Sequence, residues 1–118
     1  MAAGALFVGW GAPYPGREHK ALELFQEVLG IYGRWQQEGQ IDGFEPVALE
    51  PHGGDLNGFL LIRGSAEKLA RLRNTDEFHE INARAGLLLT HFGVTGAFTG
   101  ADLQKLFAVY DRYAGELR

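Results

Sequence analysis

The chain has 118 residues, of which 46% are hydrophobic and 22% charged, and it carries a formal net charge of −4 at pH 7. This length and balance predict one globular domain with its own core, and the negative charge argues against a nucleic-acid binder, which normally has a basic face. The absence of cysteine excludes disulfides and thiol chemistry, and the absence of a long apolar stretch predicts no membrane span.

The first half of the chain predicts a strand, a long helix and two further strands. Residues Ala5–Trp10 are apolar at both parities, which is typical of a strand buried on both faces. Residues Arg17–Gln37 have the three- and four-residue spacing of an amphipathic helix. The apolar stripe of this helix consists of Leu22, Phe25, Val28, Leu29, Tyr32 and Trp35. Strands are predicted at Phe44–Leu49 and Phe59–Ile62, and Pro46 indicates that the first of these is an edge strand.

The second half predicts two helices, a strand and a closing helix. Ser65 can cap a helix at Ala66–Arg73, and Thr75 can cap a second helix. The core side chains expected from that second helix are Phe78, Ile81, Ala85 and Leu88. Residues Phe92–Phe98 predict a strand. The closing helix opens at Thr99 or Asp102, and its apolar stripe consists of Leu103, Leu106, Phe107, Tyr110, Tyr113 and Leu117.

This order of elements predicts an α+β fold. The sequence β-α-β-β-α-β is that of a ferredoxin-like domain, here with an additional C-terminal helix. Right-handed crossovers then give a four-stranded antiparallel sheet of spatial order 4-1-3-2, in which the first and third strands are central. Those two strands are the ones without a polar face, and the edge strand is the one that contains proline. The two features agree on one topology.

The sheet is expected to be apolar on both faces, although the helices between the strands cover only one of them. One parity of the first strand holds Leu6, Val8 and Trp10, and the other holds Phe7 and Gly9. Monomers seldom expose an apolar face of this size, so either the last helix or a second copy should cover it. In element order and burial pattern, from Leu6 to about Phe98, the chain resembles the dimeric α+β-barrel proteins, in which two ferredoxin-like sheets pack face to face. The resemblance implies a homodimer, within a superfamily that includes small monooxygenases, lactone isomerases and haem-binding enzymes.

One end of the predicted sheet gathers the side chains that could carry chemistry. They are Trp10, Tyr14, Arg17, His19, His52 and His91. His91 is the candidate acid or base, because it opens an otherwise apolar strand and histidine titrates near neutral pH. Trp10 and Tyr14 could stack a planar substrate, and Arg17 could hold an anion. The alternative is that each of these side chains simply faces water.

Motifs for phosphate or metal binding are incomplete in this chain. Gly11-x4-Gly16 lacks the lysine of a phosphate loop, and His79-Glu80 lacks the second histidine of a zinc motif, because Ala83 stands there. The spacing of the remaining histidines matches no familiar metal site. We therefore expect no metal and no cofactor.

Two functions fit these observations. The first is a small-molecule binder or cofactor-independent enzyme, with a pocket between sheet and helices or inside a dimer barrel and a small aromatic or acidic ligand. The pocket lining expected for it is Trp10, Phe59, Leu61 and Phe98, with His91 as acid or base. The second is a non-catalytic dimeric stress or regulatory module. A haem-binding variant is a third hypothesis, with histidine as the iron ligand. In each case we expect a cytoplasmic homodimer with no nucleic-acid or membrane partner.

Overall fold

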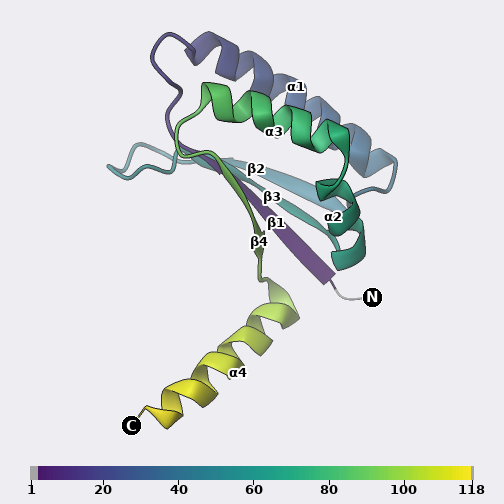
Figure 1. Cartoon of the computed structure of the whole chain (residues 1–118), viewed down its shortest axis with the longest axis vertical. Helices are drawn as coiled ribbons and strands as arrows, with labels where there is room; N and C mark the ends of the chain where they lie inside the picture. Colours follow the sequence, from purple (N-terminus) through teal and green to yellow (C-terminus); the bar gives the residue numbers. More distant parts are fainter. Residues whose placement is uncertain (1–2, 118) are drawn as a thin grey trace.

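The computed structural model describes residues 3–117, which form an antiparallel sheet of four strands together with four helices (Figure 1). In chain order the elements are β1 (Ala3–Trp10), α1 (Glu18–Gln37), β2 (Gly43–Ala48), β3 (Gly58–Ser65), α2 (Ala66–Arg73), α3 (Asp76–Leu88), β4 (Gly93–Ala97) and α4 (Gly100–Glu116). The expected α+β class is confirmed. None of the described helices is long and apolar enough to cross a bilayer.

Neighbouring strands in the sheet follow the order β2-β3-β1-β4, and every pair is antiparallel. Counted from the opposite edge, the same order is 4-1-3-2. The strands β1 and β3 are central, and β2 lies at an edge of the sheet. Because β2 has a neighbouring strand on one side only, Pro46, which lacks a backbone N–H, can be accommodated there. The C-terminal ends of β1 and β2 and the start of β4 meet at one end of the sheet, because Trp10 and Ala48 both pair with Gly58, and Gly9 pairs with Gly93.

The helices α1, α2 and α3 all lie on the same side of the sheet (Figure 1). Both predicted caps form: the Ser65 hydroxyl accepts a hydrogen bond from the backbone N–H of Lys68 at 3.1 Å, and the Thr75 hydroxyl accepts one from Phe78 at 3.2 Å. The helix α1 begins at Glu18 rather than Arg17, which is its N-cap residue. The strands and helices lie within two residues of the bounds expected for them, except that β3 continues three residues beyond Ile62 to Ser65.

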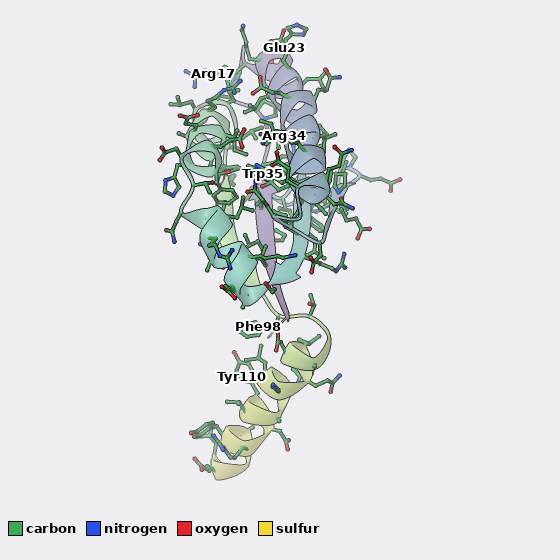
Figure 2. All side chains as sticks on the ribbon, turned by 90° about the vertical axis from the view of Figure 1, so that its right-hand side faces the viewer. Arg17, Glu23, Arg34, Trp35, Phe98 and Tyr110 are labelled. Carbon is green, nitrogen blue, oxygen red and sulfur yellow. The ribbon has the colours of Figure 1, made fainter. Side chains whose placement is uncertain are left out.

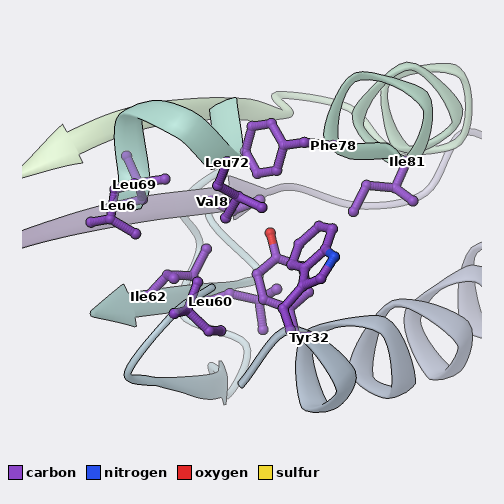
Figure 3. Close-up of a cluster of buried hydrophobic side chains, with 11 residues drawn as sticks. Leu6, Val8, Tyr32, Leu60, Ile62, Leu69, Leu72, Phe78 and Ile81 are labelled. Atoms are coloured by element: carbon purple, nitrogen blue, oxygen red, sulfur yellow. The ribbon is translucent and has the colours of Figure 1, made fainter. Parts of the chain in front are cut away.

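The hydrophobic core fills the space between the helices and this face of the sheet (Figure 3). Its buried members are Leu6, Val8, Tyr32, Trp35, Ile41, Leu60, Ile62, Leu69, Leu72, Phe78 and Ile81. Trp35 is 1% exposed, and its ring centroid lies 4.7 Å from that of Tyr32 and 6.2 Å from that of Phe78. The predicted stripe of α1 is wrong at Leu22, which is 54% exposed, because Ala21 and Leu24 take the buried positions in that turn.

Glu77 joins α1 to α3 through two hydrogen bonds. The Trp35 Nε1–H donates to its carboxylate at 2.8 Å, and the Arg34 guanidinium donates to the other carboxylate oxygen. The hydrogen bond from Arg34 is the main cause that lowers the pKa of Glu77 below its ordinary value, and the bond from Trp35 acts in the same direction. A carboxylate whose pKa is lower in the folded protein stabilises the fold above its unfolded pKa and loses that effect as the pH falls.

Replacing Glu77 by glutamine should therefore weaken the acid dependence of stability. Between about pH 5 and pH 3, the free energy of unfolding should fall less steeply for Glu77→Gln than for the wild type. Urea unfolding at a series of pH values measures this slope. Glu80→Gln, on the exposed surface of the same helix, is the control and should behave as the wild type. Equal slopes for the wild type and Glu77→Gln would contradict the account.

The helix α4 extends away from the rest of the molecule and contains no buried residue (Figures 1 and 2). Its aromatic side chains are exposed: Phe107 to 56%, Tyr110 to 67% and Tyr113 to 52%. Of the two expected covers for the open side of the sheet, the last helix of the same chain is therefore excluded in this structure, because α4 does not fold over its own sheet.

Candidate functional site

A cavity of about 290 Å³ lies between the sheet and the helices α1 and α3, at the end of the sheet where β1 terminates. The side chains around it are mostly apolar. Those from the strands, loops and sheet end are Val8, Trp10, Gly11, Pro13, Ala48, Asn57, Leu60, Leu89 and Phe92, and those from the two helices are Glu18, Ala21, Leu22, Leu24, Phe25, Val28, Tyr32, Ile81, Asn82 and Ala85. Its volume is at the lower end of the range for small-molecule sites, about 300 to 1,000 Å³.

Small side chains leave this space open. Ala21 on α1 and Ala85 on α3 occupy buried positions facing the cavity, where a leucine or phenylalanine would fill it. Further along the same helices, Trp35 and Phe78 pack against each other and close the core. The cavity is therefore a local gap in an otherwise packed layer.

One part of the cavity lining is a junction of three chain segments around Gly11. The Gly11 N–H donates to the Thr90 carbonyl at 2.7 Å, and the Asn57 N–H donates to the Trp10 carbonyl at 2.8 Å. A β-carbon on Gly11 would lie 2.7 Å from the Asp55 carbonyl oxygen and 2.8 Å from the Thr90 hydroxyl. Glycine is thus required sterically where these segments meet.

Trp10 forms one wall of the cavity and its ring is held in place from two sides. The ring meets Phe25 edge to face, with centroids 5.5 Å apart. A β-carbon on Gly58 would lie 2.8 Å from the indole, so the ring rests directly on the backbone of β3. An aromatic wall with a fixed orientation favours flat, apolar ligands.

Few polar groups face the cavity. Tyr32 is 1% exposed, and its phenol, which is neutral at physiological pH even before burial raises its pKa, can donate a hydrogen bond. Asn57 and Asn82 add two amides, and Glu18 adds a carboxylate that accepts the Gly16 N–H at 2.6 Å. The described residues that line the cavity include no lysine, arginine or histidine.

Of the six predicted site residues, only Trp10 lines this cavity. Tyr14 is 41% exposed, and the Arg17 guanidinium lies 5.4 Å from the centroid of its ring. The same guanidinium donates a hydrogen bond to the Leu87 carbonyl, so it ties the N-terminus of α1 to the end of α3. Arg17 therefore makes a structural contact between the two helices and does not line the cavity.

The three histidines are on the surface and lie apart from the cavity. His19 pairs with Glu23 at 2.9 Å on the exposed side of α1, and His52 contacts the Leu56 carbonyl at 2.8 Å within the β2–β3 turn. His91 has a φ of 52° in the turn before β4, and its Nε2 lies 3.9 Å from an Asp55 carboxylate oxygen. Within residues 3–117 no group of three histidine or acidic side chains is arranged to hold a metal.

The four side chains predicted to line one pocket do not share a surface. Trp10 points to the helix side of the sheet, whereas Phe59 and Leu61 lie on the opposite face. Phe98 is 56% exposed beyond the end of β4 (Figure 2). The prediction of this lining is wrong because it combined residues of both strand parities.

Comparisons with protein-family models, curated proteins and solved structures find no match to this chain. The geometry of the site is therefore the only basis for assigning a function.

Sequence reasoning missed the residues that create the cavity. Ala21 was outside the predicted stripe of α1, Ala85 was expected only as a core residue, and Asn57 and Asn82 were not considered. A usable signal exists: each of two facing helices has alanine at one buried position. That pattern indicates unfilled space only once the two helices are known to face each other.

Proposed function

We propose that this protein binds a small, uncharged and largely aromatic ligand in the cavity between the sheet and the helices α1 and α3. The observation that carries the proposal is the cavity itself, about 290 Å³ in volume, with one wall formed by the fixed indole of Trp10. Apolar pockets with a few polar groups are the usual form of small-molecule sites.

The polar groups support a neutral ligand over an acidic one. An acid would need a cation, but Arg17 is engaged with the Leu87 carbonyl, and Glu18 adds negative charge at the wall. The Tyr32 hydroxyl and the Asn82 amide can serve a ligand carbonyl, hydroxyl or ring N–H. Of the two ligand classes expected from the sequence, the aromatic one fits this lining.

Binding is better supported than acid–base catalysis. A general base must come within hydrogen-bond reach of the proton that it removes, and His91 lies outside the cavity with its side chain 61% exposed. Glu18 and Tyr32 are the ionisable side chains of the lining, and a tyrosine whose pKa is raised by burial is a poor base at neutral pH. We therefore propose a binding protein and assign no reaction.

We also propose a ferredoxin-like assignment and a homodimer. The element order and the strand neighbours support the first. The second is supported by an uncovered sheet face on which the Phe7 and Phe59 rings stack with centroids 5.2 Å apart. Both proposals are independent of the ligand.

Filling the cavity should weaken ligand binding without unfolding the protein. In Ala85→Leu the added side chain occupies the cavity, so the affinity for indole, a neutral aromatic probe, should fall at least tenfold. Ala83→Leu is the matched control, because Ala83 is exposed on the same helix, and its affinity should equal that of the wild type. Isothermal titration measures both affinities, and a thermal melt reports whether each variant is folded.

The acidic probe indole-3-carboxylate separates the two ligand classes. We expect it to bind more weakly than indole, because Glu18 repels its charge. Equal indole affinity in Ala85→Leu and the wild type, or no binding of indole to the wild type at millimolar concentration, would contradict the proposed function.

A further inference from the structure

Two apolar surfaces within residues 3–117 are not covered by any other part of the described chain, and the first is the sheet face opposite the helices. We call this surface the open face, and its members are Phe7, Val47, Phe59, Leu61 and Ala97. All five are partly exposed. They form one layer across all four strands, because Phe7 pairs with Leu61 and Val47 pairs with Phe59. The Glu45–Arg63 pair, 3.9 Å apart, borders the layer.

The second surface is the apolar stripe of α4, which consists of Leu103, Leu106, Phe107, Tyr110, Tyr113 and Leu117. The spacing of three and four residues places these side chains on one side of the helix. An isolated helix of this length is marginal in water and is normally stabilised by packing its apolar side. In this chain α4 buries none of its residues.

The accessible surface area and the radius of gyration of the chain are both larger than those of a compact monomer of the same size. Its accessible surface is 7723 Å², whereas a compact monomer of 13.0 kDa exposes roughly 6,300 Å². Its radius of gyration is 16.3 Å, against about 13.5 Å for a compact chain of this length. The excess area of about 1,400 Å² exceeds the roughly 800 Å² per partner that a standard protein interface buries.

The two surfaces match in length. The 17 residues of α4 span about 25 Å, and the eight residues of the central strands β1 and β3 span about 26 Å. The link between β4 and α4 is short, and its residue Thr99 is extended, with φ −138° and ψ 158°. The helix continues beyond the end of β4 and extends away from the rest of the molecule (Figure 1).

We propose that the apolar stripe of α4 packs on the open face of a second copy, and that the second copy's α4 packs on the first in return. This inference rests on the homodimer proposed above and names the element that makes its contact. A two-fold exchange covers both unpartnered surfaces of both copies through one repeated contact. In this dimer the open face is covered by a helix of the second copy and does not pack against the second copy's sheet.

Substitutions on α4 test the exchange in the full chain. Light scattering should give twice the chain mass for the wild type. The double variant Phe107→Asp, Tyr110→Asp should weaken dimerisation at least 100-fold, and the protein should remain folded because α4 lies outside the core. Ala108→Asp, on the opposite side of the same helix, is the control and should remain dimeric. A monomeric wild type would overturn both the homodimer and the exchange.

Cross-linking identifies which surfaces meet, and the absence of cysteine makes it specific. Two single-cysteine chains, Phe59→Cys and Tyr110→Cys, are mixed and treated with a short bismaleimide. The exchange predicts a cross-link between the two different chains. A cross-link only between two Phe59→Cys chains would keep the homodimer but overturn the exchange. A third chain carries both substitutions, Phe59→Cys and Tyr110→Cys. A cross-link formed within one molecule of this chain would show that α4 folds back on its own sheet, and would also overturn the exchange.

Discussion

Replacing Trp35 by alanine should lower the free energy of unfolding by about 3 to 5 kcal/mol. The side chain is 1% exposed and packs on Tyr32 and Phe78, so its removal leaves a large cavity between α1 and α3. The variant also loses the hydrogen bond from the indole to Glu77. A domain of this size is stable by only about 6 to 18 kcal/mol, so the loss is a large share of the total.

Urea unfolding measures this loss, with two variants for comparison. Trp35→Phe keeps an aromatic ring but not the N–H donor, so its loss should be smaller than that of Trp35→Ala. Gln36→Ala changes an exposed neighbour and should stay within about 0.5 kcal/mol of the wild type. A loss below about 1 kcal/mol in Trp35→Ala would show that this contact is not central to the core.

Replacing Gly11 by alanine should destabilise the protein and also weaken binding in the cavity. Its β-carbon would lie 2.7 Å from a backbone oxygen of Asp55 and 3.0 Å from that of Thr90, and neither atom can move without shifting its chain segment. We expect a cost of about 1 to 3 kcal/mol. The indole affinity should fall as well, because Gly11 lines the cavity.

The matched control for this variant is Gly86→Ala in α3. A β-carbon at Gly86 would meet no atom within 4 Å, and alanine is the better helix former by about 1 kcal/mol. The melting temperature should therefore fall in Gly11→Ala and rise in Gly86→Ala. Gly86→Ala should bind indole as the wild type does. A stabilised Gly11→Ala variant would contradict the close junction around Gly11.

The sequence predicted the order of elements and the central strands, because those depend on local patterns. Strand parity and helical spacing can be read within a few residues, as the Ser65 and Thr75 caps illustrate. The direction of α4 was not predictable in this way. An apolar stripe indicates that a helix needs a partner, but the extended backbone at Thr99 decides which surfaces it can reach.

The candidate site was predicted only in part. Trp10 lines the cavity, but the histidines grouped with it lie outside the lining, and the side chain of His91 is 61% exposed in the turn before β4. A cavity arises from what two distant helices leave unfilled, here at Ala21 and Ala85. Such a gap depends on packing between segments, and no single stretch of sequence contains it.

The most direct test of the ligand site is an NMR titration with indole that follows the two tryptophan side-chain N–H signals. Trp10 lines the cavity, whereas Trp35 lies outside its lining and is held by Glu77. The account predicts a saturable shift of the Trp10 signal with little change at Trp35, and no shift in Ala85→Leu. An unchanged Trp10 signal up to millimolar indole, or equal shifts at both tryptophans, would contradict it.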